Sequence, residues 1–149
     1  MRLTTCDNRI IRDTSQVFFM QDLPESVRKL VLDKNFGFIA TLNLDGSPQV
    51  TPVWVDTDGK YILVNTVLGR IKQKNAVRDS RVALSIIDGR DPYTRASMTG
   101  RVVEQIKGIV AENHIDKLSK KYRGVDRFAR RSSDERRVIL KIEAIRIFQ

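Results

Sequence analysis

The sequence predicts a mainly β protein of the α+β class, a six-stranded β-barrel of Greek-key type with flanking helices. Six segments have the alternating or β-branched pattern of strands, and only three have helical periodicity. Two Asp-Gly pairs, Asp45-Gly46 and Asp58-Gly59, lie between strand-like segments and predict tight hairpin turns. A chain of 149 residues with 41% hydrophobic residues can build one core, so residues 1–149 are expected to form a single domain with an N-terminal extension at 1–22.

A helix and a three-stranded meander are expected in the first half. Residues 24–35 carry apolar side chains at helical spacing, and Pro24 suits a first helical turn. The next strand, 36–44, has apolar residues at every second position, namely Phe36, Phe38, Ala40, Leu42 and Leu44. The two Asp-Gly turns then delimit a second strand at 47–56 and a third at 60–66.

The second half alternates helices and strands. It is expected to contain a helix from Gly69 to Arg78, a β-branched strand at 81–88, a loop at 89–92, a strand at 93–105, a helix at 106–123, a basic stretch at 124–137 and a final strand at 138–148. Within the fifth strand, Gly100 is expected to mark a bulge or a close approach of two backbones.

The second hairpin predicts a cluster of polar residues. If Thr57 pairs with Lys60 across a two-residue turn, Thr51 lies opposite Thr66 and Pro52 opposite Asn65, to within one step of register. Gln49, Thr51, Asn65 and Thr66 would then share the sheet end from which the chain continues to Gly69. Because Pro52 lacks an N–H group, the pairing is expected to open or end near it.

The helix after Gly69 begins with an unusual concentration of cations. Arg70, Lys72 and Lys74 occupy its first turn, and no acidic residue occurs between Tyr61 and Arg78. A helix N-terminus carries partial positive charge, so these cations act against the local preference for Asp or Glu. A bound phosphate would reverse that effect, since free N–H groups, the dipole and the cations all favour an anion. A solvated basic helix face is the alternative.

Residue counts limit the possible chemistry. With one His and one Cys, the chain has no His/Cys zinc cluster and no plausible Cys–His dyad, and His114 is expected to be structural or on the surface. Any reaction would then depend on a bound cofactor. No apolar run is long enough for a membrane span, the first residues lack the apolar segment of a secretory signal, and the lone Cys6 fits a reducing compartment, so a cytoplasmic protein is expected.

Other residues have two interpretations. Trp54 and Tyr61 lie on predicted strands and could stack on a planar ligand, although a core or interface position is the more common use of such residues. The polar loop at 88–92 could reach a partner subunit or form a plain turn. The formal net charge of +9 indicates an anionic partner, either a phosphorylated small molecule or nucleic acid.

Several motifs occur together between residues 36 and 104. They are FGFIATLNLDGSPQVTPVWVD, ILVNTVLGRIKQKNAVRDSRVALSIID with its central G-R-x-K-x-x-N, then DPY and TGRVVE. In this order and spacing they resemble the pyridoxamine 5′-phosphate oxidase-like split-barrel flavoproteins, with the closest similarity to the branch of coenzyme F420-dependent oxidoreductases. The resemblance implies a split six-stranded barrel and a homodimer with two cofactor sites at its interface.

The resemblance also implies roles for particular residues. The positions expected to flank or contact the ring system are Gln49, Val50, Thr51, Pro52, Val64, Asn65 and Thr66. Arg70 and Lys72, preceded by Gly69, match the phosphate-binding pair of the family, and Asn75 follows in the same helix. The loop that ends at Tyr93 would approach the cofactor of the partner subunit.

The implied function is that of an oxidoreductase that binds FMN or coenzyme F420 and transfers hydride to or from a small organic substrate. The cofactor would carry the hydride, so no catalytic acid or base is assigned. Both cofactors remain open; nine basic against three acidic residues between 117 and 137 favour the acidic tail of coenzyme F420. Pyridoxamine phosphate oxidation is not expected, because the segment after Lys107 does not match the substrate-binding residues of that oxidase.

Two alternatives belong to other classes. The chain could bind a flavin without turnover, as a carrier or sensor. It could also be a basic nucleic-acid-binding barrel, but aromatic residues make up only 7% of the chain and no strand face carries an evenly spaced stacking platform.

Overall fold

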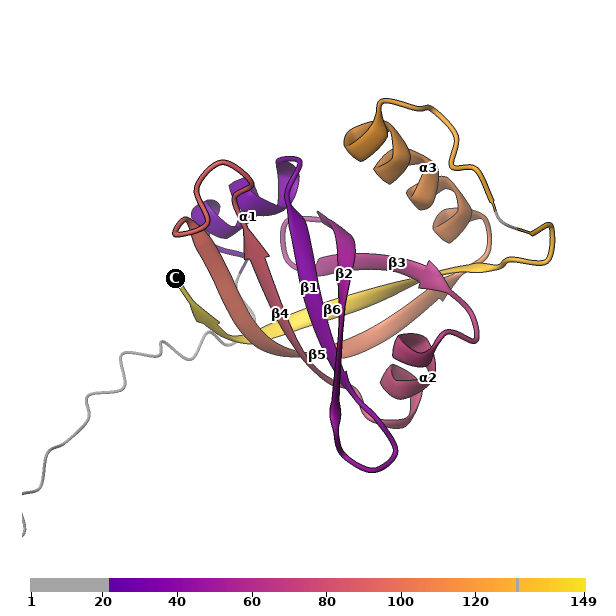
Figure 1. Ribbon diagram of the computed structural model, residues 1–149, viewed down its shortest axis with the longest axis horizontal. Coiled ribbons are helices and arrows are strands. Elements are labelled where there is room, and N and C mark those ends of the chain that lie inside the picture. Colours follow the sequence, from indigo (N-terminus) through magenta and orange to yellow (C-terminus); the bar gives the residue numbers. More distant parts are fainter. Residues whose placement is uncertain (1–21, 131) are drawn as a thin grey trace, which may run out of the picture.

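A closed antiparallel barrel with three surrounding helices is seen in the computed structural model, which describes residues 22–130 and 132–149 (Figure 1). Residues 1–21 of the expected N-terminal extension lie outside this part. The strands are β1 (Phe36–Leu42), β2 (Pro48–Thr57), β3 (Ile62–Val67), β4 (Arg81–Ile87), β5 (Arg95–Lys107) and β6 (Arg137–Phe148). The helices are α1 (Glu25–Leu32), α2 (Ile71–Arg78) and α3 (Ile109–Arg123).

The strand order around the barrel is β1-β2-β3-β6-β5-β4. The meander β1-β2-β3 is followed by α2, after which β4 returns to pair with the other edge of β1. The resulting spatial order, β4-β1-β2-β3, is that of a Greek key. The predicted mainly β, six-stranded barrel with flanking helices is therefore confirmed.

The side of β1 that carries an apolar residue at every second position faces away from the barrel interior, and the opposite side faces inward. Ile39 is fully buried, and Gly37 leaves room for Val55, whose Cγ1 would lie 2.7 Å from a Cβ added to the glycine. Phe36 and Phe38 point outward and are 50% and 39% exposed. The outward side of β1 is thus the more apolar of the two and is only partly covered within the described part of the chain. The other fully buried barrel residues include Val55, Ile62, Val64, Ile86, Leu140 and Ile142.

The predicted hairpin registers are wrong, and side-chain hydrogen bonds explain the larger error. The β2–β3 ladder pairs Thr57 with Ile62 and ends at Val55 and Val64, a shift of two residues from the predicted register. Asp58 Oδ1 accepts hydrogen bonds from the backbone N–H groups of Lys60 and Tyr61, at 3.0 and 2.8 Å. These bonds stabilise a four-residue loop in place of the predicted two-residue turn.

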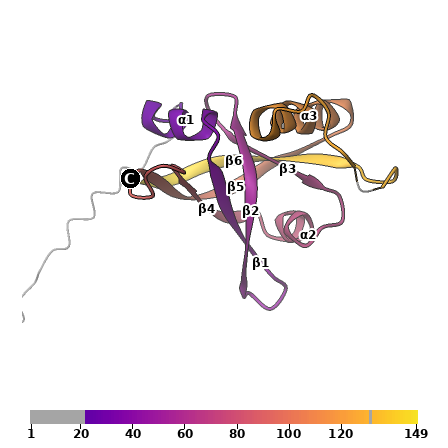
Figure 2. The same cartoon turned by 45° about the horizontal axis from the view of Figure 1, so that its top comes forward.

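The first hairpin also has a longer loop. Its strands pair from Leu42 and Pro48, and the backbone N–H of Asn43 donates to the carbonyl of Ser47 at 2.9 Å. Gly46 has φ of 82°, so the loop contains a residue in the left-handed region and is one residue longer than predicted. In both views this hairpin projects away from α1 and α3 (Figures 1 and 2).

The ladder between β2 and β3 opens early, as Pro52 suggested. Because the ladder ends at Val55, Thr51 does not face Thr66 and Pro52 does not face Asn65; Asn65 and Thr66 pair with Ile139 and Val138 of β6 instead. Beyond Val55 the two strands diverge, with β2 running into the projecting hairpin and β3 toward α2 (Figure 1). The segments Pro52–Trp54 of β2 and Asn65–Thr66 of β3 are therefore not joined by a ladder.

Two features of β5 complete the fold. The strand begins at Arg95, so Tyr93 lies in the preceding loop and not in the strand as predicted. The predicted irregularity at Gly100 is confirmed: the register shifts there, and an added Cβ would lie 2.3 Å from the carbonyl oxygen of Glu143. Within the described residues, no helix is long and apolar enough to cross a membrane.

Candidate functional site

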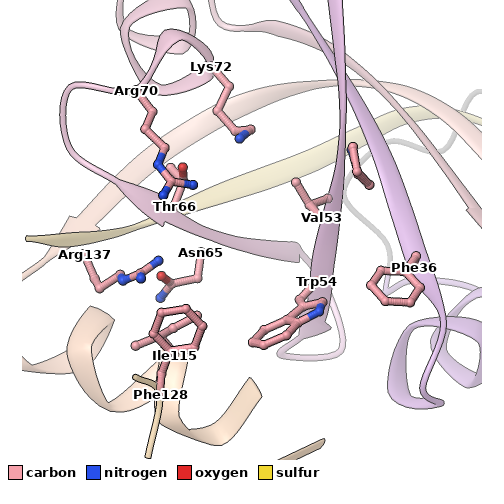
Figure 3. Close-up of a pocket in the computed structure, with 11 residues that line it drawn as sticks. Phe36, Val53, Trp54, Asn65, Thr66, Arg70, Lys72, Ile115, Phe128 and Arg137 are labelled. Atoms are coloured by element: carbon pink, nitrogen blue, oxygen red, sulfur yellow. The ribbon is translucent and has the colours of Figure 1, made fainter. Parts of the chain in front are cut away.

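A pocket of about 220 Å³ occupies the opening between β2 and β3. Its walls come from β1 and β2 on one side, β3 and α2 on the second, and α3 with the following segment on the third (Figure 3). The lining residues are Phe36, Pro52, Val53, Trp54, Asn65, Thr66, Arg70, Lys72, Ile115, Phe128 and Arg137. The pocket thus combines an aromatic wall with three cations and two small polar side chains.

Several buried polar atoms in and beside the pocket lack partners. Among the described residues, no hydrogen bond is made by Asn65 Oδ1, Thr66 Oγ1 or Arg137 Nε. Gln49 Oε1 and Thr51 Oγ1, further along β2, are also without partners in the described part of the chain. Buried polar groups are satisfied in the great majority of cases, so a cluster of exceptions is typical of a place where a ligand or ordered water supplies the missing bonds.

The cations of α2 face the pocket from its N-terminal end. Arg70 is the N-cap residue, and neither a capping side chain nor an acidic residue occupies the first turn of this helix. Burial, followed by the charge of Arg70, lowers the pKa of Lys72. No ion pair to Lys72 occurs in the described part of the chain. An anion held here would compensate both charges and the helix dipole.

Arg137 adds a third cation that the sequence analysis did not assign to the site. Its side chain is almost fully buried, its guanidinium lies 3.2 Å from Glu135 Oε2, and it packs 4.5 Å from the centre of the Phe128 ring. Burial lowers its pKa, although Glu135 acts in the opposite direction. Glu135 Oε1 also lies 4.0 Å from Arg70, so one carboxylate serves two arginines. The pocket therefore retains excess positive charge.

The aromatic wall is built by residues distant in sequence. Trp54 stacks on Tyr122 of α3, with ring centres 5.1 Å apart, and meets Phe128 edge-on at 5.8 Å. The indole of Trp54 thus packs within the chain and also lines the pocket, which combines the two interpretations given above. Tyr61 is not among the lining residues; Lys60 and Lys141 lie over its ring.

The structure brings some of the expected site residues together and leaves others apart. Pro52, Asn65, Thr66, Arg70 and Lys72 line the same pocket. The remaining positions lie elsewhere: Gln49, Val50 and Thr51 continue along β2 past the pocket, Gly69 precedes α2, Val64 faces the barrel interior, Asn75 is buried against Thr41 and Asn43, and Tyr93 is 88% exposed in its loop.

Besides Phe36 of β1 and Val53 of β2, the missed residues come from the end of the chain. Ile115, Phe128 and Arg137 line the pocket because α3 and the segment after it pack over the opening. The only sequence signal for them was the basic composition of 117–137. The basic composition of this segment indicated an anionic ligand, but it did not indicate which residues of the segment face the pocket.

The fold and the pocket together define a six-stranded barrel domain with a cation-lined pocket between β2 and β3. Comparison with protein families makes this definition specific. The sequence pattern of the family described as pyridoxamine 5′-phosphate oxidase matches residues 23–149. The chain belongs to this family, as the motifs between residues 36 and 104 suggested.

Solved structures show the same fold. An F420 reductase is 26% identical, with a TM-score of 0.72 over 85% of this chain and 98% of that one. A conserved hypothetical protein of Mycobacterium tuberculosis is 22% identical, with a TM-score of 0.63 over 89% of this chain and 87% of that one. A candidate pyridoxamine 5′-phosphate oxidase of Lactobacillus delbrueckii is 21% identical, with a TM-score of 0.59 over 86% and 94%. No curated protein matches the sequence.

Proposed function

We propose that the protein is an oxidoreductase that holds FMN or coenzyme F420 in the pocket between β2 and β3. The phosphoryl group would lie on Arg70 and Lys72, and the ring against Pro52, Asn65 and Thr66. The observation that carries this proposal is the joint occurrence, in one pocket, of incompletely neutralised cations at a helix start and unpartnered buried polar atoms. Both kinds of group are stabilised by a ligand that has an anionic end and a polar ring.

The residues of the pocket suit such a cofactor. When bound, the cofactor would supply the hydride chemistry, and the protein would supply position and electrostatics. Arg70 and Lys72 can each donate charge-assisted hydrogen bonds to phosphoryl oxygens. Trp54 and Phe128 provide apolar surface that excludes water beside the ring. The substrate would be a small organic molecule that reaches the exposed side of the ring.

A second copy of the chain would complete the site. One chain provides a cavity of about 220 Å³, whereas ligand pockets commonly reach about 300–1,000 Å³. The outer face of the β1–β2 hairpin is apolar and continuous with the pocket; its cross-strand pairs are Phe36 with Trp54, Phe38 with Pro52, Ala40 with Val50, and Leu42 with Pro48. Exposed apolar surface of this kind marks an interaction site.

This homodimer gives the remaining expected residues a role. Gln49 and Thr51 on β2, together with Val50, would lie at the interface close to the ring. Tyr93, at 88% exposure in its loop, would approach the cofactor of the other subunit. The unpartnered Gln49 Oε1 and Thr51 Oγ1 support a ligand or a partner beside them.

Coenzyme F420 is favoured over FMN. The alignment with the F420 reductase, at 26% identity, covers 98% of that protein and 85% of this chain. The nine basic residues between 117 and 137 lie in and after α3, which packs over the pocket, and would suit the acidic tail of that coenzyme. Both cofactors contain a phosphoryl group, so the proposed role of Arg70 and Lys72 is the same for either.

A titration with FMN and with coenzyme F420, followed by fluorescence, tests the phosphate site. The variant R70A/K72A should bind at least about a hundredfold more weakly, because each charge-assisted contact contributes about 1.5–3 kcal/mol. The control K29A/K107A removes two exposed lysines outside the pocket and should bind like the wild type. Equal affinity of R70A/K72A and the control would contradict the assignment.

The proposed dimer is tested by introducing a charged residue on the outer, apolar face of the β1–β2 hairpin. Val50 is 60% exposed on β2, and V50K should yield monomers in sedimentation and weaken cofactor binding. Val103 on β5 is 48% exposed and provides a matched control, since V103K adds the same charge on a strand outside the hairpin. A V50K protein that remained dimeric would show that another face forms the interface.

A further inference from the structure

Asn65 is held from behind by α3. Its amide nitrogen, Nδ2, lies 2.8 Å from the carbonyl oxygen of Ala111 and 3.2 Å from Nδ1 of His114. A backbone carbonyl only accepts hydrogen bonds, so the side-chain atom beside Ala111 is the NH2 group. The other end of the amide, Oδ1, is buried and has no partner among the described residues. Since Asn65 lines the pocket, its free acceptor belongs to the ligand site.

The contact with Asn65 determines the tautomer of His114. The NH2 group donates one hydrogen to Ala111 and the other to Nδ1, so Nδ1 must be unprotonated. The proton of the neutral ring is then on Nε2, which lies 3.2 Å from Asp56 Oδ2 and donates to it. The carboxylate of Asp56 thus fixes the tautomer and orientation of the His114 ring, as carboxylates do for histidines in other proteins.

Asp56 is a buried carboxylate whose charge is compensated. It is 2% exposed, and Lys117 Nζ lies 2.6 Å from the same oxygen that His114 contacts. Burial alone would raise the pKa of Asp56, but hydrogen bonds from His114 and Lys117 outweigh burial and lower it. An ionised carboxylate only accepts hydrogen bonds, which again requires the proton of His114 to be on Nε2.

We propose that Asp56 and His114 are positioning residues that fix the Asn65 amide with Oδ1 toward the pocket. The ligand group opposite Asn65 must then be a hydrogen-bond donor, and the ring imide N–H of a flavin or deazaflavin is such a group. The identity of the ligand rests on the proposed function, whereas the orientation of the amide rests only on Ala111, His114 and Asp56.

The tautomer can be measured without any ligand. The chain contains a single histidine, so the full-length protein without an affinity tag, labelled with ¹⁵N-histidine, gives one set of ring signals in a long-range ¹H–¹⁵N correlation spectrum. We expect Nδ1 to be unprotonated and the ring proton to be on Nε2. A proton on Nδ1, in the other tautomer or in the charged ring, would place two donors against each other and overturn the proposal.

A ligand comparison tests the consequence for recognition. FMN should bind the wild type more tightly than its N3-methyl analogue, which lacks the imide donor, and H114A should reduce this preference about two- to tenfold, the effect of one hydrogen bond. N65A, which removes the acceptor itself, should reduce the preference similarly. A structural defect would weaken both ligands equally and leave the preference unchanged, which would refute the positioning role.

The two proposals can fail separately. If the wild type bound neither FMN nor coenzyme F420, the proposed function would be wrong, and the NMR measurement would still decide the orientation of the amide. If H114A failed to fold, N65A and the wild-type tautomer would still test the proposal.

Discussion

The hydroxyl group of Thr66 provides a test in which protein stability and ligand affinity change in opposite directions. Thr66 is 2% exposed, lines the pocket, and its Oγ1 has no hydrogen-bond partner among the described residues. A buried hydroxyl without a partner costs about 1–3 kcal/mol. The substitution T66V replaces the hydroxyl by a methyl group of nearly the same size, so it removes this cost without creating a cavity.

We therefore expect T66V to raise the free energy of unfolding of the ligand-free protein by about 1–2 kcal/mol. For a chain of this length, each 1 kcal/mol corresponds to about 2–4 °C in Tm, which is measurable by calorimetry. The same substitution should weaken FMN or coenzyme F420 binding about two- to tenfold, since one neutral hydrogen bond contributes about 0.5–1.5 kcal/mol.

Thr41 supplies the matched control. It is 1% exposed, and its hydroxyl accepts a hydrogen bond from Asn75 Nδ2 at 3.1 Å. T41V makes the same chemical change at a satisfied hydroxyl and should lower the stability of the protein. If T66V destabilised the ligand-free protein as much as T41V does, Thr66 would have an internal partner, and the reasoning from unpartnered atoms would be refuted.

Two further predictions concern the fold around the site. Burial raises the pKa of Tyr122 from 10.0 to about 12, so its contribution to stability is present below pH 10 and is lost as the pH rises toward 12. Denaturant titrations should show the free energy of unfolding of the wild type falling by up to about 2–3 kcal/mol over this range. Y122F should show no such fall, although it is less stable at neutral pH because the Val55 N–H loses its acceptor. If the free energies of unfolding of both proteins changed with pH in parallel, the titration of Tyr122 would be excluded as the cause. G100A should destabilise by about 1–3 kcal/mol, since its Cβ would lie 2.3 Å from the carbonyl oxygen of Glu143. At Gly89 an added Cβ would lie 4.0 Å from Asn35 Oδ1, an ordinary contact, so G89A should be nearly neutral; equal stabilities of the two variants would contradict the close packing at Gly100.

The barrel could be predicted because local signals agreed with the global fold. Alternating segments, Asp-Gly turns and the helix before the fourth strand are all properties of neighbouring residues. The register of the second hairpin was wrong by two residues because it depends on how Asp58 bonds to the following backbone, which a turn dipeptide does not specify. The inward side of β1 was not evident from the sequence because its outward side is the more apolar of the two.

Only those residues of the candidate site that lie close to one another in the sequence could be predicted. Arg70 and Lys72 were detectable because cations at a helix start contradict the local preference. Arg137 and Phe128 reach the pocket only through the packing of the last part of the chain over the opening, and no local pattern encodes that packing. His114 was expected to be structural or on the surface, and the positioning role proposed for it rests on two contacts, to Asn65 and Asp56, that connect distant segments.

The most direct test of the account is a crystal structure of the protein soaked with FMN or coenzyme F420. We predict electron density for the phosphoryl group within hydrogen-bonding distance of Arg70 and Lys72, with the ring beside Asn65 and Thr66. A pocket filled by side chains of the protein itself, or a cofactor bound elsewhere, would contradict the account.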